Sequence, residues 1–339
     1  MKITAVDPFY LKMPEVTAAA DGTQDTLLVR IRTDAGLEGW GECDASPLVT
    51  LAAYCCPMSH GNIINVRTSL LGETLDGPDD VRRLHAKMLR SGLDIAQIHH
   101  AASGADIALW DLAGQRLSRP IYALLDDGPA HPKLPYGSVL FGDTPELTRE
   151  RAVDLRRRGY RAAKFGWGPM GRAGEAEDVA LVRAAREGLG SDGPGGREPR
   201  LMVDAGVAWG EDAETAYARA VAFAPYRLTW LEEPLSPDAI EAYAALAARR
   251  PPVPIAAGEG SGTYRAAEDL ALHGGVQYLQ IDAGRIGGIT TAHRVRKLAE
   301  ARGLQFPARR LSAPGRCWCA AGRDTRNSET SPASSSSSL

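Results

Sequence analysis

Acidic residues follow three consecutive apolar segments of the sequence at almost equal intervals. Asp204 ends the segment "LMVD", Glu232 ends "LTWLE", and Glu259 follows "IAAG". An interval of about 30 residues is one strand-helix unit of a parallel α/β protein, so neighbouring strands would present these carboxylates at the same edge of a sheet. Carboxylates crowded at one edge need a cation to neutralise them, and their hard oxygen atoms suit Mg²⁺.

A simpler interpretation of these acids is that each one caps the following helix or faces solvent. That interpretation explains a single acid well, but it does not explain three in succession. Two further polar residues end apolar segments: Lys164 in "RAAK" and Asp282 in "LQID". A lone lysine at such a place is commonly a salt-bridge partner. Beside three carboxylates, Lys164 is also a candidate to bind a substrate carboxylate or to transfer a proton.

The elements that must position these residues alternate along the chain. Six short apolar segments between residues 136 and 282 each precede an amphipathic helix pattern. This order predicts a parallel sheet with helical crossovers, and six successive units favour a (β/α) barrel of the TIM type. A seventh strand begins at Leu304, so the predicted barrel is incomplete at its C-terminal end. Residues 1–125 start with alternating strands and continue into helices, which indicates a separate α+β domain.

Composition excludes several classes of function. The net charge of −3 provides no field that would attract nucleic acid or an anionic membrane. The sequence has no apolar stretch of membrane-spanning length, and its first residues lack the apolar core of a signal peptide. Five cysteines, an odd number, show no disulfide spacing. We therefore expect a cytoplasmic protein with no nucleic-acid or membrane partner.

Longer motifs add a family resemblance. The "EEP" run at 232–234 and the "DAGRIGGIT" run at 282–290 resemble the enolase superfamily, mandelate racemase subgroup. In the first domain, "GLEGWGE" and "SGADIALWDLAGQRL" are similar to that family's capping domain and to the segment that enters its barrel. The resemblance reaches to about residue 306. It implies an α+β capping domain at 1–125 and a partial (β/α) barrel at 126–306.

The resemblance also implies roles for individual residues. Asp204, Glu232 and Glu259 match the Mg²⁺ ligands of the family. Asp282 matches the acid that orients a catalytic histidine, and Lys164 matches the first lysine of a Lys-x-Lys motif. The implied chemistry is removal of the proton next to a carboxylate, with Mg²⁺ stabilising the enediolate that forms. The implied partner is a small carboxylate such as an acid sugar, and intact relatives are expected to be homo-oligomers.

Departures from the family pattern bear on the reaction. Gly166 replaces the second lysine of Lys-x-Lys, and Gly206 stands where asparagine is often found. No histidine ends the seventh strand. His273 falls at a helix end and His293 falls inside a helix, so neither can replace it. A racemase needs bases on both faces of the carbon, whereas a dehydratase needs one base and one acid. Gly166 therefore favours dehydration of an acid sugar to a 2-keto-3-deoxy acid over racemisation or epimerisation.

Two other features of the sequence bear on function. The segment "GWGPMG", from Gly166 to Gly171, has the spacing of a dinucleotide-binding loop and leaves an NAD-dependent dehydrogenase as an alternative. Asp204 lies 33 residues beyond Gly171, however, whereas the ribose-binding acid of that motif lies about 20 residues on. Residues 17–24 and 46–58 are expected to be loops that determine substrate specificity, and the polar character of 17–24 suits hydroxyl groups.

The last segment, 307–339, has neither strand nor helix periodicity and carries a run of serines at 334–338. We expect an aberrant, disordered tail, and its composition is consistent with a shifted reading frame. Read one base later, Pro307 to Arg309 can encode Pro-His, the pair that supplies the base in the family. Loss of that base predicts impaired proton abstraction, and a non-catalytic product remains an alternative.

Overall fold

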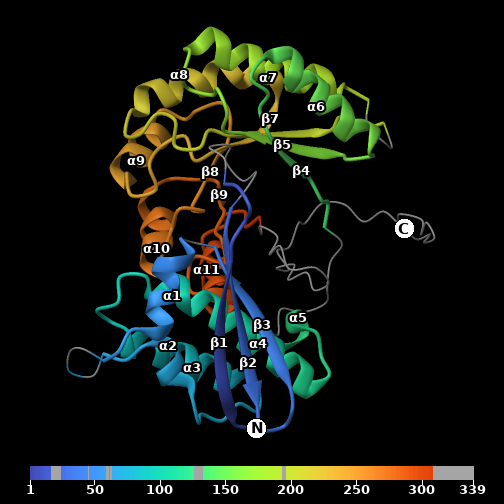
Figure 1. The fold of residues 1–339 in the computed structure, drawn as a ribbon. Coiled ribbons are helices and arrows are strands. Elements are labelled where there is room, and N and C mark those ends of the chain that lie inside the picture. The colour runs from blue at the N-terminus through green and yellow to red at the C-terminus, as the bar shows by residue number, and fades with distance from the viewer. Residues whose placement is uncertain are drawn as a thin grey trace.

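The computed structural model divides into an N-terminal α+β region and a C-terminal region built on one parallel sheet (Figure 1). The first predicted specificity loop, apart from its last residue, and the tail after Pro307 lie outside the described part of the chain. The structure describes residues 1–16, 24–44, 46–58, 61, 63–125, 133–192 and 196–307. No helix in these segments is both long enough and apolar enough to cross a membrane.

The N-terminal region contains a three-stranded antiparallel sheet in the order β1-β2-β3. On β2, Leu27, Val29 and Ile31 are fully buried and alternate with less buried residues, as one buried face of a sheet requires. The three strands are β1 (Ile3–Leu11), β2 (Thr26–Thr33) and β3 (Glu38–Cys43). The helices around them are α1 (Pro47–Cys55), α2 (Val66–Leu70), α3 (Pro78–Ser91), α4 (Ile98–Leu117) and α5 (Ile121–Leu124).

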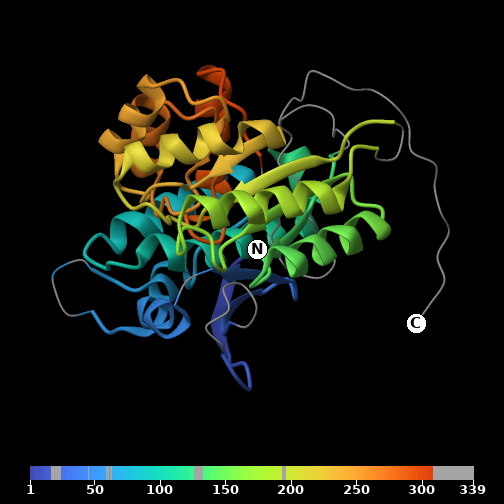
Figure 2. The same cartoon turned by 90° about the horizontal axis from the view of Figure 1, so that it is seen from above.

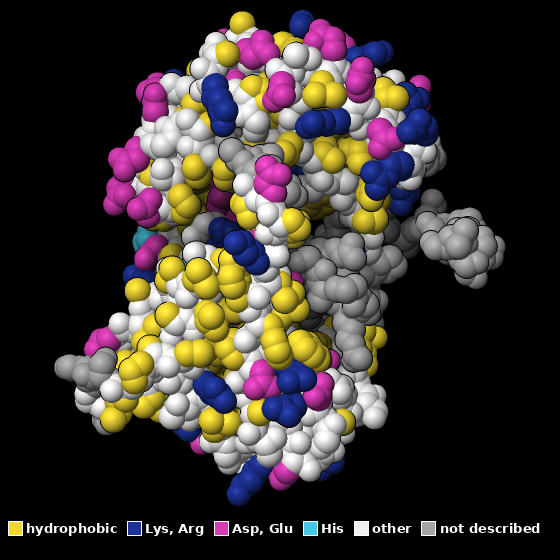
Figure 3. All heavy atoms as spheres, viewed as in Figure 1, with side chains coloured by type: hydrophobic (Ala, Val, Ile, Leu, Met, Phe, Trp, Pro, Cys, Tyr) yellow, Lys and Arg dark blue, Asp and Glu magenta, His cyan; other side chains and the backbone are white. Residues whose placement is uncertain are grey.

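The other face of this sheet carries exposed apolar side chains. Figure 3 shows hydrophobic side chains gathered over the strands that face the viewer in Figure 1. Trp40 on β3 is 43% exposed and stacks on Phe9 of β1, with a ring-centroid distance of 5.8 Å. The guanidinium of Arg30 lies over both rings, so this indole has partners within its own sheet.

Helix α4 connects the two regions through a buried polar contact. Asp106 on α4 accepts hydrogen bonds from the backbone N–H of Thr290 at 2.8 Å and from its hydroxyl group at 2.6 Å. Trp110 donates its indole N–H to the same hydroxyl oxygen at 2.9 Å. Thr290 lies in the first turn of α11 (Gly288–Ala301), where backbone N–H groups have no partner within the helix. A carboxylate from one region therefore satisfies the helix start of the other.

The parallel sheet has six strands, and their spatial order is their order in the chain. The strands are β4 (Gly137–Leu140), β5 (Ala162–Gly166), β6 (Arg200–Asp204), β7 (Leu228–Glu232), β8 (Ile255–Ala257) and β9 (Tyr278–Leu279). A helix follows each one: α6 (Pro145–Arg157), α7 (Glu175–Leu189), α8 (Ala213–Phe223), α9 (Ile240–Ala248), α10 (Tyr264–His273) and α11. These helices form an outer layer, and α6, α7 and α8 lie in front of the strands when the molecule is seen from above (Figure 2).

This arrangement confirms the predicted α/β fold, with a parallel sheet of the barrel type and an α+β capping region. In the described part of the chain, β4 and β9 are the two edges of the sheet. Gln305 forms a single parallel bridge with Tyr278, at the position where the sequence predicts a seventh strand.

The register of the strands arranges their side chains in layers. Lys164 pairs with Met202 and Met202 with Trp230, and two residues further along, Asp204 pairs with Glu232. Because side chains alternate along a strand, Met202 and Asp204 share a face, as do Trp230 and Glu232. Trp230 packs with Tyr136 and Tyr278 at centroid distances of 6.2 and 5.1 Å. An aromatic layer therefore underlies the strand ends that carry the acids.

Candidate active site at the carboxyl ends of the strands

The three acids singled out by spacing lie together in the structure. Asp204 ends β6, Glu232 ends β7, and Glu259 follows β8. One carboxylate oxygen from each residue lies within 4.8 Å of the corresponding oxygens of the other two. Asp204 and Glu232 are buried, and Glu259 is partly exposed. Three hard oxygen donors converging in this way fit a divalent ion such as Mg²⁺.

Lys164 brings a positive charge to this cluster from β5. Its Nζ atom lies 2.9 Å from Oδ2 of Asp204 and 2.7 Å from Oε1 of Glu232. Burial disfavours the charged ammonium, but the carboxylates of Glu232 and Asp204 outweigh it and raise the pKa of Lys164. Lys164 is therefore a salt-bridge partner of Asp204 and Glu232 in this structure. A protonated lysine can still donate to a substrate carboxylate, but it cannot accept a proton.

Glu232 is surrounded by hydrogen-bond donors. Besides Lys164, Gln280 donates its side-chain N–H to Oε1, and Trp230 donates its indole N–H to Oε2 at 2.9 Å. Burial acts to raise the pKa of Glu232, but three donors around one carboxyl group match the ionised form. The spacing of the acids does not predict that Gln280 and Trp230 contact Glu232. The contact with Trp230 could have been predicted, because residues two apart on a strand lie on the same face of the sheet.

Glu233 fixes the loop that carries Glu259. Its carboxylate accepts hydrogen bonds from the backbone N–H groups of Gly260 at 2.8 Å and Gly258 at 3.4 Å. Burial raises the pKa of Glu233, and these two hydrogen bonds act against the increase. Glu233 belongs to the "EEP" motif at 232–234, and its spacing alone predicts no role for it. In the structure it holds the segment on both sides of Glu259.

Asp282 lies just beyond β9 and meets the N-terminal region. Its Oδ1 accepts the backbone N–H of Gly284 at 2.6 Å, and Gly284 in turn accepts the backbone N–H of Asp44 at 3.0 Å. Burial and the neighbouring carboxylate of Asp44 raise the pKa of Asp282 to about 7. Arg285 donates to Oδ2 of Asp44 at 3.1 Å and supplies a positive charge nearby. The site thus includes a contribution from the segment after β3.

Comparison with known families identifies this fold. The family model "Mandelate racemase / muconate lactonizing enzyme, N-terminal domain" matches residues 2–126, and "Enolase C-terminal domain-like" matches residues 147–319. The chain belongs to the enolase superfamily, mandelate racemase subgroup. The second match extends beyond Phe306, where the resemblance was expected to end.

Individual relatives include enzymes of two reaction types. L-talarate/galactarate dehydratase of Salmonella typhimurium is 31% identical over 284 residues, which cover 83% of this chain and 66% of the dehydratase. The chain thus spans slightly less than two thirds of that relative. A solved structure described as a predicted mandelate racemase from Rhodobacter sphaeroides is 49% identical, with a TM-score of 0.84 over 91% of this chain and 77% of that one. A racemase from Streptomyces coelicolor, solved with bound magnesium, is 27% identical, with a TM-score of 0.76 over 91% and 85% of the two chains.

The structure gives a steric reason for two departures from the mandelate racemase pattern. A Cβ atom on Gly166 would lie 2.7 Å from Cβ of Asp204, so a side chain at this position would displace that acid. A Cβ atom on Gly206 would lie 2.8 Å from the indole of Trp167. A side chain at position 166 would therefore compete with Asp204 for space.

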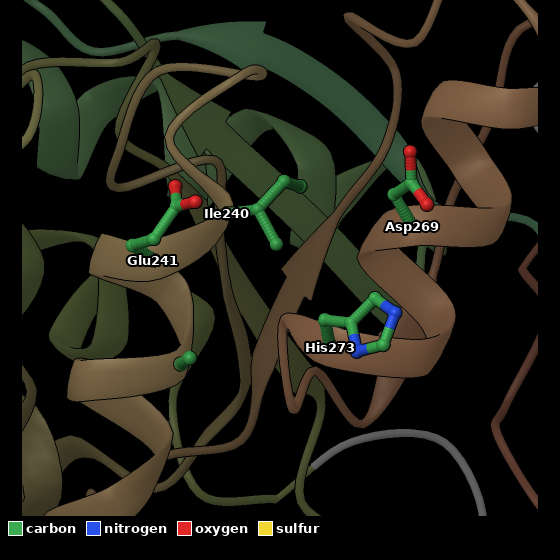
Figure 4. A pocket seen from close by; sticks show the side chains of 5 residues that line it. Ile240, Glu241, Asp269 and His273 are labelled. Atoms are coloured by element: carbon green, nitrogen blue, oxygen red, sulfur yellow. The ribbon is translucent and has the colours of Figure 1, made fainter.

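The remaining sequence candidates lie elsewhere. His273 is the last residue of α10, and His293 is buried within α11, so neither ends a strand. A hollow of about 300 Å³ lies between α9 and α10 and shares no residue with the strand-end site (Figure 4). It is lined by Ile240, Glu241, Ala244, Asp269 and His273.

Proposed function

We propose that this chain derives from a Mg²⁺-dependent enzyme that removes the proton next to a carboxylate and dehydrates an acid sugar to a 2-keto-3-deoxy acid. The observation that carries the proposal is the convergence of three carboxylate oxygens within 4.8 Å at the strand ends of a mandelate racemase-type fold. The similarity to a galactarate dehydratase supports the substrate class.

Each site residue has a proposed role. Asp204, Glu232 and Glu259 would hold the ion. When bound, Mg²⁺ would neutralise the negative charge that develops on the substrate carboxylate as the adjacent carbon loses its proton. Lys164, as an ammonium group, would donate to the same carboxylate. Asp282, fixed by the N–H of Gly284, stands where the family has the acid that orients a catalytic histidine, but the sequence has no histidine after His293.

The choice of dehydration over racemisation rests on Gly166. Gly166 provides no side chain that could act as a base on the second face of the carbon. A larger residue at this position would clash with Asp204. A racemase or epimerase of the same superfamily remains the second candidate, and similarity to the magnesium-containing racemase favours it.

We further propose that proton abstraction is impaired in this chain. Within the described residues, the amino group of Lys164 is paired with two carboxylates, and no histidine ends a strand of the barrel. If proton abstraction is lost completely, the chain is a non-catalytic product. The dehydrogenase alternative loses support, because α7 begins at Glu175 and the glycine-rich segment ending at Gly171 does not open a helix directly.

The proposal is tested by incubating the chain with galactarate, L-talarate or D-gluconate and MgCl₂ in D₂O, followed by NMR. The 49%-identical Rhodobacter sphaeroides protein serves as the intact comparison. We expect 2-keto acids from the relative and a much lower rate from this chain. Exchange of the α-proton without net product would support the racemase candidate. Turnover of aryl 2-hydroxy acids alone would contradict the substrate class, and fast turnover by this chain would contradict the impairment.

A further inference from the structure

An exposed indole stands at the rim of the proposed site. Trp167 directly follows Gly166, the last residue of β5, and is 42% exposed. Its φ of 56° lies in the left-handed region, which bulky residues rarely adopt. Backbone strain of this kind persists where the surrounding structure enforces it, and it gathers at ligand sites.

The same strain recurs on the next two strands. Val207, after β6, has a φ of 58°, and Glu233, after β7, has a φ of 38°. Three successive strands thus leave the sheet near the proposed site through left-handed residues that are not glycine. The other such residues in the described part of the chain follow helices, where this conformation is ordinary. They are Ser118, Arg227 and Arg250.

The indole is held beside a proposed metal ligand. A Cβ atom on Gly206 would lie 2.8 to 3.1 Å from three fused-ring atoms of Trp167, so the glycine covers part of one ring face. The backbone N–H of Gly206 donates to Oδ1 of Asp204 at 3.0 Å. The backbone N–H of Trp167 donates to the backbone oxygen of Asp204 at 3.2 Å. The ring position is therefore coupled to the position of Asp204.

We propose that Trp167 is a specificity-determining residue whose open indole surface packs against the C–H bonds of the acid sugar's carbon chain. This inference rests on the proposed function. The carboxylate end of the substrate is attracted to Lys164 and to an ion at Asp204. A ring one residue beyond β5 is then close to the carbons that follow, and Gly166 places no side chain between them. Aromatic faces bind apolar C–H surfaces while the hydroxyl groups remain available for hydrogen bonds.

The test measures ligand affinity by calorimetry in MgCl₂, with galactarate and D-gluconate as six-carbon ligands and glycolate as a two-carbon ligand. Trp167→Ala should weaken the six-carbon ligands by about tenfold and leave glycolate within about twofold of the wild type. Trp167→Phe should retain most of the affinity. Trp40→Ala removes an indole of equal exposure on the capping sheet and should change nothing.

Equal affinity of Trp167→Ala and the wild type for both six-carbon acids would overturn the inference. A wild-type chain that binds none of the three acids in MgCl₂ would instead refute the proposed function on which it rests. If Trp167→Ala fails to fold, fluorescence decides the matter. Galactarate should change the emission of the wild type more than that of Trp167→Phe, which keeps Trp230 beside Glu232. Identical changes in both would contradict the proposal.

Discussion

The Nζ atom of Lys164 lies 2.7 Å from Oε1 of Glu232, inside a sheet that brings together residues 68 positions apart. Both groups are buried, and Asp204 is a second carboxylate within 2.9 Å of the same ammonium group. Lys164 and a divalent ion would therefore counter the same negative charge. This relationship links the stability of the fold to the proposed metal site.

Replacing Lys164 by Met should destabilise the chain and increase its response to Mg²⁺. Removing one partner of a buried ion pair typically costs about 3–5 kcal/mol of unfolding free energy, because the remaining charge stays buried. Mg²⁺ would supply the missing positive charge, so MgCl₂ should raise the Tm of Lys164→Met more than that of the wild type. Lys297→Met, at an exposed position on α11, is the control. A Lys164→Met variant with wild-type stability and an unchanged Mg²⁺ response would be inconsistent with this account.

Adding a single methyl group at Gly166 should weaken Mg²⁺ binding. The new Cβ atom would lie 2.7 Å from that of Asp204, closer than real Cβ contacts, so Asp204 must move. We expect Gly166→Ala to lower Mg²⁺ affinity by about tenfold or more, as measured by calorimetry. Gly77→Ala is a suitable control, since its Cβ would have no contact closer than 3.9 Å. Unchanged affinity in Gly166→Ala would show that Asp204 is not a ligand or that it moves freely.

The buried carboxyl group of Asp106, which is not part of the proposed metal site, should make the stability of the chain depend on pH. Burial raises its pKa to about 7, against hydrogen bonds from Thr290 and Ile289 that lower it. In an unfolded chain aspartate titrates near pH 4, so between about pH 4 and 7 the folded chain holds a proton that the unfolded chain has lost. The free energy of unfolding therefore falls as the pH rises through this window.

Asp106→Asn removes this titration. The Tm of the wild type minus that of Asp106→Asn should decrease as the pH is raised from 5 to 8, measured by calorimetry at fixed ionic strength. All other titrating groups are common to the two proteins and cancel in the difference. A difference that stays constant or increases with pH would show that burial does not control this carboxyl group.

The sequence predicts the fold and the position of the acids well, because both depend on local periodicity. The alternation of apolar segments and helices gave all six strands of the sheet, and the spacing of Asp204, Glu232 and Glu259 placed them at consecutive strand ends. Partners fixed by long-range docking could not be predicted in this way. The approach of Asp44 to Asp282 depends on how the capping region meets the barrel.

Local conformation was also hidden from the sequence pattern. Nothing in "KFGWG" shows that Trp167 adopts a left-handed backbone or that its indole lies against Gly206. Gly166 and Gly206 stand out in the sequence as departures from the pattern that the family resemblance implies. Their physical reason, close contact with Asp204 and Trp167, required coordinates. The expectations for residues 308–339 concern a segment outside the described part of the chain.

The most direct test of the central claim is the shift in Tm that saturating MgCl₂ produces in three proteins: the wild type, Glu259→Gln and Glu187→Gln. Glu187 is an exposed acid on α7 and controls for the loss of one negative charge. If Asp204, Glu232 and Glu259 bind Mg²⁺ together, the wild type and Glu187→Gln should show the same increase by linkage, and Glu259→Gln should show none. An undiminished increase in Glu259→Gln, or no increase in the wild type, would contradict the proposed metal site.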